Sequence, residues 1–307
     1  MSKRPPENLS ASVKGRLLRI ARERREEFQS TLTRYAAERF LYRLSESPHR
    51  QRFVVKGASL FALWLGAPHR PTRDLDLLGF GGQERGPMAD VFRAICRQSV
   101  ADDGLVFDAA SVQVAAARED EKYAGLRVTF RASLGKAVIP MQVDIGFGDA
   151  ITPGAREAQM PTLLDDPAPR LLTYPRETVV AEKCEAMIGL GLGNSRLKDF
   201  YDLWHLATRF DFDGPLLGRA IAATLGRRGT ALPALPPAAL TAAFFEDAAR
   251  SRQWSAFLAR SGLGADVSLA ACVLVLRDFL LPPLAAIRDE ARLEGRWRHE
   301  ERQWGRA

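Results

Sequence analysis

The sequence predicts an α+β fold, in which a mixed β-sheet flanked by helices is followed by a C-terminal helical bundle. Up to about residue 150, short alternating or apolar stretches typical of strands lie between stretches with helical spacing. After a connection with several prolines, the pattern is nearly all helical, with breaks expected at Leu232–Ala238 and at Pro282-Pro283. We therefore expect two parts, residues 1–150 and residues 151–307.

The composition is that of a soluble globular protein. Of the 307 residues, 46% are hydrophobic and 26% are charged, so the chain can bury a substantial core. We expect no membrane span, because no apolar run reaches the roughly 18 residues that one needs, and no signal peptide, because the N-terminus lacks an apolar core. The cysteines Cys96, Cys184 and Cys272 are far apart, which argues against a disulfide framework and favours a reducing cytoplasm.

The first expected elements are two helices between Ser10 and Ser47, where apolar residues recur at helical spacing and arginines fill the other faces. Such basic faces are usually solvated, and RNA contact is the less common explanation. The net charge of +7 permits binding of nucleic acid or nucleotide phosphates without requiring it. The other elements expected before residue 150 are strands at 52–55, 74–80, 123–132 and 138–148 and helices at 60–66 and 89–100.

Two carboxylates one residue apart mark the strand DLDLLGF. Asp74 and Asp76 alternate with leucines, so in an extended strand both carboxylates lie on one face, with Cα atoms about 7 Å apart. The ordinary explanation is a solvent-facing strand, and a D-x-D pair alone is a weak signal. However, burying two unpaired carboxylates is costly, and bound Mg²⁺ would remove that cost because it prefers carboxylate and phosphate oxygens.

Asp144 strengthens the metal hypothesis. It lies in VIPMQVDIGFG, where apolar residues alternate with polar ones, on the same polar face as Gln142. If this strand neighbours DLDLLGF, three carboxylates without local counter-charges converge on one patch. A two-metal phosphoryl-transfer site requires such a set of acids.

The segment Lys56-Gly57-Ala58-Ser59 stands between an expected strand and an expected helix. Backbone N–H groups at such a turn can face an anion with help from the helix dipole. Glycine at the turn allows phosphates to approach the backbone closely. The turn is therefore a candidate phosphate-binding element.

This turn, the D-x-D strand and the later acid resemble the nucleotidyltransferase superfamily. More narrowly, FVVKGASLFALWLGAPHRPTRDLDLLGF, with its Lys-Gly turn and R-x-T-x-D-h-D run, is similar to the AbiEii/AbiGii toxin family, which includes the MenT toxins of mycobacteria. VVAEKCEAMIGLG and RLKDFYDLWHL resemble later motifs of that family, and the resemblance spans about residues 13–206. One departure is Ala58, where the family usually has Gly or Ser, so phosphate contact there must come from the backbone N–H.

The two later motifs can also be explained without the family. Asp199 and Asp202 lie on one helix face, and Lys198 is four residues before Asp202, which is typical of a salt-bridged amphipathic helix. Lys183 lies in an apolar helical stripe and could snorkel to water. The functional alternative is that Lys183 reaches the NTP phosphates and that Asp199 or Asp202 fixes it.

The resemblance implies a nucleotidyltransferase-like sheet and the toxin of a bacterial toxin–antitoxin or abortive-infection system. It implies a cytoplasmic, Mg²⁺-dependent enzyme that adds nucleotides from NTP to RNA, with the tRNA 3′ acceptor end as the expected acceptor. The implied metal ligands are Asp74, Asp76 and Asp144. The implied catalytic residues are Asp74, Asp76, Lys183, Asp199 and Asp202. The implied nucleotide contacts are Lys56, Gly57, Ala58, Ser59, Arg73 and Lys183.

Two alternatives stay open: nucleotide transfer to a protein hydroxyl, and a catalytically silent module that binds RNA or protein. The chain has three acids and a lysine that the silent module does not need for any chemistry, which argues against that alternative: Asp74, Asp76, Asp144 and Lys183.

A separately encoded antitoxin is also expected from the resemblance, either a DNA-binding protein or a kinase-like one. Thr72 lies two residues before Asp74. A phosphate on Thr72 would repel the NTP phosphates and block the metal site. Thr72 is therefore a candidate regulatory phosphorylation site.

Overall fold

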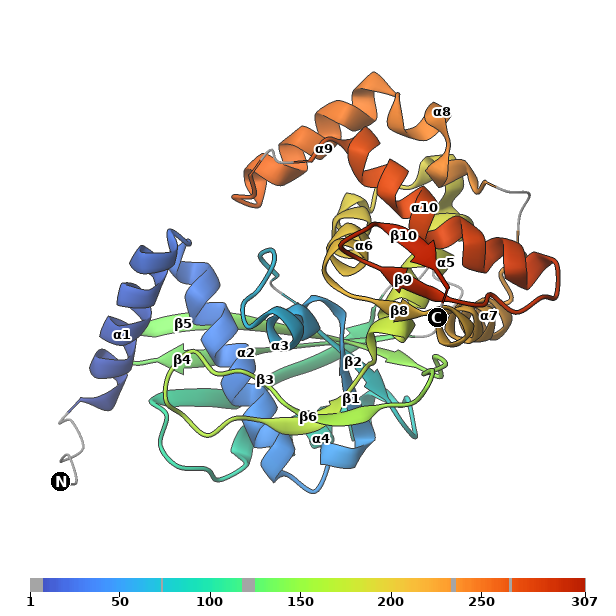
Figure 1. Ribbon diagram of the computed structural model, residues 1–307. Helices are drawn as coiled ribbons and strands as arrows, with labels where there is room; N and C mark the ends of the chain where they lie inside the picture. Colours follow the sequence, from blue (N-terminus) through green and yellow to red (C-terminus); the bar gives the residue numbers. More distant parts are fainter. Residues whose placement is uncertain (1–7, 73, 118–124, 233–235, 265–266, 307) are drawn as a thin grey trace. The chain divides into compact units, whose positions relative to one another are not determined.

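The protein divides into two compact units, seen here in a computed structural model (Figure 1). Unit 1 comprises Met1–Gly148 and Arg156–Thr173, and unit 2 comprises Asp149–Ala155 and Tyr174–Ala307. Residues 156–173, which the sequence places in the second part, thus return to unit 1. The structure describes residues 8–72, 74–117, 125–232, 236–264 and 267–306.

Unit 1 is built on a seven-stranded mixed sheet in the order β3-β4-β5-β2-β1-β7-β6. β2 pairs with β5, and β1 with β7, in parallel, and the other neighbours are antiparallel. The predicted mixed sheet flanked by helices is confirmed. The strands are β1 (Phe53–Lys56), β2 (Leu75–Gly79), β3 (Leu105–Ala116), β4 (Leu126–Leu134), β5 (Ala137–Phe147), β6 (Arg156–Gln159) and β7 (Arg170–Thr173).

Three of these strands were not expected from the sequence. β3 has a register shift between Asp108 and Gln113, which interrupts the alternation that reveals a strand. β6 and β7 have only four residues each, too few for a clear period. The strand expected at 123–132 begins in the structure at Leu126, and its residues 123 and 124 lie outside the described part of the chain.

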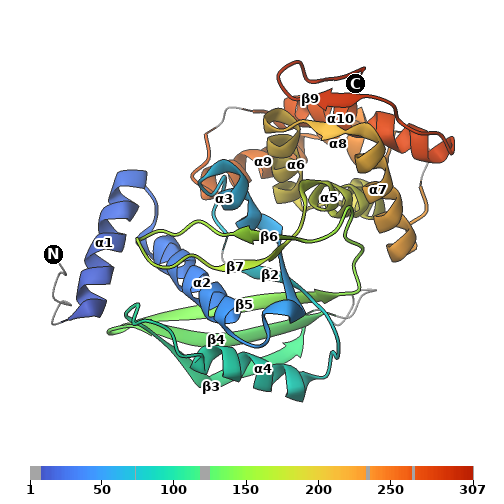
Figure 2. The same ribbon diagram turned by 60° about the horizontal axis from the view of Figure 1, so that its bottom comes forward.

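Helices α2 and α4 cover the apolar side of the sheet. Figure 2 shows α2 running alongside β5 and α4 alongside β3. Phe40 of α2 stacks on Phe92 of α4 at 5.6 Å and lies 4.9 Å from the ring of Phe130 on β4. Each fully buried phenylalanine contributes about 1.5–3 kcal/mol. The helical elements of unit 1 are α1 (Leu9–Arg24), α2 (Phe28–Glu46), α3 (Leu60–Leu65) and α4 (Arg85–Arg97), with 3₁₀ turns η1 (Arg50–Arg52) and η2 (Gly57–Ser59).

A buried ion-pair cluster ties α2 to the residues just before β3. The Asp103 carboxylate is 3.1 Å from Arg39 Nε and 2.6 Å from Arg43 Nη1. The Tyr35 hydroxyl donates to the Asp103 backbone carbonyl at 2.9 Å. Burial by itself would raise the pKa of Asp103, but hydrogen bonds and attraction from the two guanidinium groups hold that pKa below its ordinary value.

Unit 2 is mainly helical, as predicted, with a small three-stranded sheet that was not expected from the sequence. The strands of this sheet have only two or three residues, which is too short for a recognisable period. The break expected at Leu232–Ala238 includes residues 233–235, outside the described part. The elements are α5 (Arg176–Leu190), η3 (Gly191–Gly193), α6 (Leu197–Arg209), β8 (Phe212–Asp213), α7 (Gly214–Arg228), η4 (Ala238–Leu240), α8 (Ala242–Phe245), α9 (Ala248–Arg260), α10 (Leu269–Arg288), β9 (Arg296–Arg298) and β10 (Gln303–Gly305).

The helix break expected at Pro282-Pro283 is wrong, because α10 continues through both prolines. Pro283 has no N–H, so the carbonyl of Phe279 loses its usual helical donor. The indole N–H of Trp304 on β10 donates to that carbonyl at 3.1 Å. A side chain from elsewhere in unit 2 therefore satisfies the acceptor that the proline leaves open.

No uninterrupted apolar run of about 18 residues occurs in α10, as expected, because Arg277 and Asp278 interrupt its apolar sequence. Among the described helices, α10 passes the test of length and composition, with 20 residues and a mean hydropathy of 1.8. Within unit 2, α10 packs against α6 and α7 and buries Cys272, Leu276 and Leu280, among others. Packing in the core of unit 2 accounts for this apolar face.

The cluster around Asp103 gives a stability prediction. Asp103→Asn removes the charge that faces two buried guanidinium groups, so we expect a loss of about 3–5 kcal/mol in the free energy of unfolding at neutral pH. The depressed pKa stabilises the fold above the unfolded pKa of about 3.9, and this contribution is lost as the pH falls through the folded pKa. Urea denaturation at pH 7 and in acid measures this effect. The free energies of unfolding of the wild type and of Asp103→Asn should be more similar in acid than at pH 7.

The matched control is Asp90→Asn in the exposed pair with Arg93 on α4. Exposed pairs contribute little, so this variant should unfold like the wild type. If Asp103→Asn cost no more than Asp90→Asn, the cluster would not hold α2 to β3.

Candidate functional site

Four neighbouring strands of unit 1 bring charged residues into one row. Backbone pairing places Lys56 of β1 opposite Asp76 of β2. Asp76 is paired with Asp144 of β5, which lies opposite Arg127 of β4. The expectation that the strand of Asp144 neighbours the D-x-D strand is therefore confirmed. Because neighbouring strands are about 4.8 Å apart, these residues form a continuous row across the sheet, called here the charged row: Lys56, Asp76, Asp144 and Arg127.

Asp74 lies immediately before β2, on the same side of the chain as Asp76. It is exposed, whereas Asp76 is half-buried. Leu75 and Leu77 point the other way and are 3% and 0% exposed, so the core holds the strand and leaves the two carboxylates on the polar side. Asp74 is also close enough to Arg127 to help raise the pKa of that guanidinium, after the larger effect of the hydrogen bonds to Asp144.

Asp144 of β5 has a counter-charge on the neighbouring strand β4. Arg127 Nε and Nη2 donate to its two carboxylate oxygens at 2.8 and 2.9 Å, and Gln142 Nε2 lies 3.4 Å from both oxygens. The expectation that the three acids lack local counter-charges is therefore wrong for Asp144. The antiparallel register of β4 and β5, which a single sequence does not reveal, places Arg127 there.

The donor chemistry fits Mg²⁺ at Asp74 and Asp76. Both offer carboxylate oxygens from one side of β2, and neither is fully buried. Among the residues that the structure describes, no three His, Cys, Asp or Glu side chains are gathered as a metal-binding cluster. Both oxygens of Asp144 already accept hydrogen bonds from Arg127, so a metal ion would have to use their remaining lone pairs, and the metal-binding role of Asp144 stays a prediction.

The turn after β1 is fitted to Asp76 by a glycine. Gly57 has φ +74°, a left-handed conformation that favours glycine. A Cβ atom on Gly57 would lie only 2.8 Å from both Cβ and Cγ of Asp76. The absence of a side chain at Gly57 therefore allows the acid to pack directly against the turn, which fixes the two elements relative to each other.

The rest of the turn was expected to face an anion with help from the dipole of the following helix, and the structure limits the contribution of that helix. The Ser59 hydroxyl donates to the Lys56 carbonyl at 3.2 Å and so closes the turn on itself. Ala58 is 7% exposed. The helix that follows, α3, has only six residues, so a smaller dipole effect is expected than for a full-length helix. Arg73, a predicted nucleotide contact, lies outside the described residues.

A second cluster lies in unit 2, where Lys183 of α5 meets two acids of α6. Lys183 Nζ is 2.7 Å from Asp199 Oδ1 and 2.8 Å from Asp202 Oδ2. The lysine side chain is 12% exposed, and the acids are 1% and 0% exposed. The structure thus contradicts the snorkelling alternative, and both acids fix the ammonium group.

Arg196, at the start of α6, completes this cluster. Its Nε is 2.6 Å from Asp199 Oδ2. Burial by itself would raise the pKa of Asp199, but attraction to Lys183 and Arg196 holds it below its ordinary value. Asp199 is therefore an anion held between two cations in a nearly closed environment.

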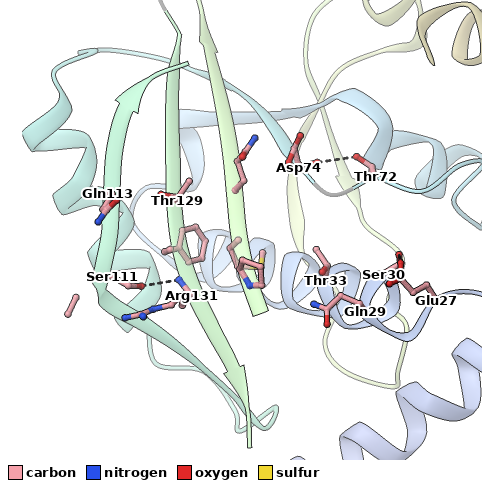
Figure 3. Close-up of a pocket in the computed structure, with 15 residues that line it drawn as sticks. Glu27, Gln29, Ser30, Thr33, Thr72, Asp74, Ser111, Gln113, Thr129 and Arg131 are labelled. Atoms are coloured by element: carbon pink, nitrogen blue, oxygen red, sulfur yellow. Dashed lines mark hydrogen bonds between the residues drawn. The ribbon is translucent and has the colours of Figure 1, made fainter. Parts of the chain in front are cut away.

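A groove of about 790 Å³ opens in unit 1 beside Asp74 (Figure 3). In Figure 3, Gln113 and Thr129 lie on one side of the groove, Gln29 and Thr33 on the other, and Asp74 at one end. Hydroxyl and amide groups are the main polar groups of this lining. Thr72 also lies at the Asp74 end, where its exposed hydroxyl is 3.3 Å from the Asp74 carbonyl oxygen.

Some residues of these sites were not found from the sequence. Arg196 could have been found, because it is three residues before Asp199 and helical spacing places the two together. Arg127, Gln113 and Thr129 could not, because their position depends on how β3, β4 and β5 pair.

The chain is similar to known nucleotidyltransferases. The sequence model of a family described as the nucleotidyl transferase AbiEii toxin of type IV toxin–antitoxin systems matches residues 39–273. A Helicobacter pylori structure described as a candidate nucleotidyltransferase is 15% identical, with a TM-score of 0.44, and the match covers 83% of this chain and 94% of that one. JHP933 from Helicobacter pylori is 14% identical, with a TM-score of 0.39, over 82% and 94%. No curated protein sequence matches the chain.

The cluster around Lys183 gives a second stability prediction. Lys183→Met leaves two buried carboxylates without the ammonium group, so we expect a loss of about 3–5 kcal/mol in the free energy of unfolding at pH 7. In the wild type, the depressed pKa of Asp199 contributes stability above its unfolded pKa, and this is lost as the pH falls through the folded pKa. In Lys183→Met, burial favours the protonated form of the two acids. The difference in the free energy of unfolding between the wild type and this variant should therefore be smaller in acid than at pH 7.

Chemical denaturation across this pH range measures both effects. Lys198→Met is the control, because Lys198 is an exposed lysine of α6, the helix that carries Asp199 and Asp202. An equal loss in both variants would mean that the Lys183 cluster does not join α5 to α6.

Proposed function

Because the chain belongs to the family of AbiEii nucleotidyl transferase toxins of type IV toxin–antitoxin systems, we propose that it transfers a nucleoside monophosphate from an NTP to RNA. The proposed acceptor is the 3′ end of tRNA, whose modification would block translation. The charged row is the observation that supports this proposal, since it sets a basic turn directly against a carboxylate pair. We place the reaction in the cytoplasm, where NTPs and tRNA occur.

In this proposal the turn after β1 binds the triphosphate. Lys56 supplies a positive charge, and the backbone N–H groups of Gly57, Ala58 and Ser59 supply donors in a turn that packs directly against Asp76. Arg73, one residue before the first acid, is proposed to contact the same phosphates. The row has a cation at each end, Lys56 and Arg127, and two acids between them, and this charge pattern would orient the nucleotide.

Asp74 and Asp76 would hold Mg²⁺, which supplies charge neutralisation at the phosphates when bound. The acceptor hydroxyl forms a new bond to the α-phosphorus while the bond from that phosphorus to the bridging oxygen of the β-phosphate breaks. Pyrophosphate leaves, and the hydroxyl proton passes to a carboxylate of the row. The chain contributes mainly position and charge balance to this step.

We propose that Lys183, Asp199 and Asp202 act in the same reaction, as the family resemblance implies. The two acids hold the Lys183 ammonium group at 2.7 and 2.8 Å, which limits its motion. An ammonium group fixed in this way can meet a phosphate oxygen with little loss of side-chain entropy.

The family also implies a cognate antitoxin. We propose that Thr72 is the point at which a kinase-like antitoxin acts, because its exposed hydroxyl lies beside the Asp74 backbone. A phosphate there would add a charge of about −1.5 to −2 next to the carboxylate pair. This charge would repel the NTP phosphates.

The reaction is tested by incubating the purified protein with each α-labelled NTP, Mg²⁺ and total tRNA. We expect label on RNA, and Asp76→Asn should lower the rate by about 100-fold or more, because a metal ligand contributes several kcal/mol to charge stabilisation. Asp90→Asn is the control. The absence of label with all four NTPs would reject the proposal.

Two other results would point to the alternatives. Label on protein and not on RNA would favour transfer to a protein hydroxyl. RNA binding without any thermal stabilisation by NTP and Mg²⁺ would favour the silent binding module, because an enzyme that uses NTP should be stabilised by it.

The role of Thr72 is tested with a matched pair of variants. Thr72→Glu should raise KM for NTP about tenfold through repulsion, whereas Thr72→Gln has the same shape without the charge and should resemble the wild type. Equal effects of the two variants would contradict the electrostatic explanation. Mass spectrometry of toxin co-expressed with its antitoxin shows directly whether Thr72 carries phosphate.

A further inference from the structure

A second row of polar residues runs beside the charged row on the same face of the sheet. Thr129 is two residues after Arg127 on β4, and Gln142 is two residues before Asp144 on β5. The two are cross-strand partners, and Gln113 of β3 pairs with Thr129. Residues two apart in a strand share a face about 7 Å apart. This second row is uncharged, and it is called here the neutral row: Gln113, Thr129 and Gln142.

The neutral row forms part of the groove beside Asp74. The charged groups in the lining do not favour phosphate. Glu27 and Asp74 are acids, and Arg131 is held by Asp108 at 2.9 Å. Amides and hydroxyls, in contrast, can pair with the hydrogen-bonding edges of a nucleobase and with ribose hydroxyls. The groove therefore suits the nucleoside part of a nucleotide better than its phosphates.

Both substrates of the proposed reaction, the NTP and the RNA acceptor, carry a nucleoside. The order of the strands indicates which of the two lies in the groove. In-line displacement places the attacking hydroxyl opposite the departing pyrophosphate. Lys56 and its turn, the proposed triphosphate site, belong to β1, whereas the neutral row begins on β5 and runs through β4 to β3, away from β1. The acceptor should therefore approach from the groove side.

We propose that this groove binds the 3′-terminal nucleoside of the RNA acceptor, and that Gln113 and Thr129 contact its base. This inference rests on the proposed function, since it assigns one substrate of that reaction to a place on the sheet. Gln142 is excluded as a test residue because it also contacts Asp144. Gln113 is exposed and Thr129 is half-buried, so both can be changed with little effect on the core.

Photocrosslinking tests the location without requiring catalysis. A tRNA transcript that ends in 4-thiouridine is bound to the full chain, irradiated and digested, and the labelled peptide is identified. We expect the label on peptides of β3, β4 or the start of α2. Labelling confined to other peptides, or no labelling, would overturn the proposal.

Kinetics test the contacts. Gln113→Ala and Thr129→Val should each raise KM for tRNA about two- to tenfold, the effect of one lost hydrogen bond, while KM for NTP stays within about twofold. Gln83→Ala, at an exposed glutamine in the loop after β2, is the control and should change neither value. Circular dichroism melting verifies that each variant is folded.

The outcomes separate this inference from the proposed function. A rise in KM for NTP alone would assign the groove to the incoming nucleotide and overturn the acceptor assignment. Unchanged kinetics in both variants would also overturn it. If the wild type transferred to no RNA, the proposed function would fail, and the crosslinked peptide alone would then support or overturn RNA binding in the groove.

Discussion

The close packing of Asp76 against Gly57 sets the arrangement of the polar face of unit 1. The antiparallel pairing of β1 and β2 brings the two together, and the glycine leaves room for the carboxylate. The same strand β2 pairs on its other side with β5, so the position of Asp144 follows from that of Asp76. Arg127 and the neutral row then follow from the register of β4. A shift of β2 by one residue would turn both acids of the D-x-D pair into the core.

The acids of the ion-pair clusters and of the D-x-D pair fall into buried ones with a close counter-charge and more exposed ones on the polar face of the sheet. Asp103, Asp199 and Asp202 are almost completely buried, and each lies within 3.1 Å of a cationic nitrogen. The exposed Asp74 and half-buried Asp76 lie where a solvated cation can approach. Burial with a fixed counter-charge is typical of a structural ion pair, whereas a partly exposed carboxylate can be reached from solvent.

The sequence was sufficient for the elements with a clear period and insufficient for those that depend on pairing. Alternation predicted β2 and β5 and placed Asp74, Asp76 and Asp144 on polar faces. Helical spacing and the family resemblance predicted that Lys183 meets the acids of α6. The counter-charge at Asp144 and the neutral row escaped prediction, because strand register is a property of the folded chain. The continuous α10 was missed because its proline defect is repaired by Trp304, far along the sequence.

The return of residues 156–173 to unit 1 has a consequence for how the chain can be divided. β7 is the parallel partner of β1, and β6 covers β7 in turn. A fragment that stopped near residue 150 would keep the acids but would expose the backbone donors and acceptors of β1. Such an open edge pairs readily with other chains. The strands that carry Asp76 and Asp144 and the segment that covers the edge of β1 are therefore separated in sequence by residues 149–155, which belong to unit 2.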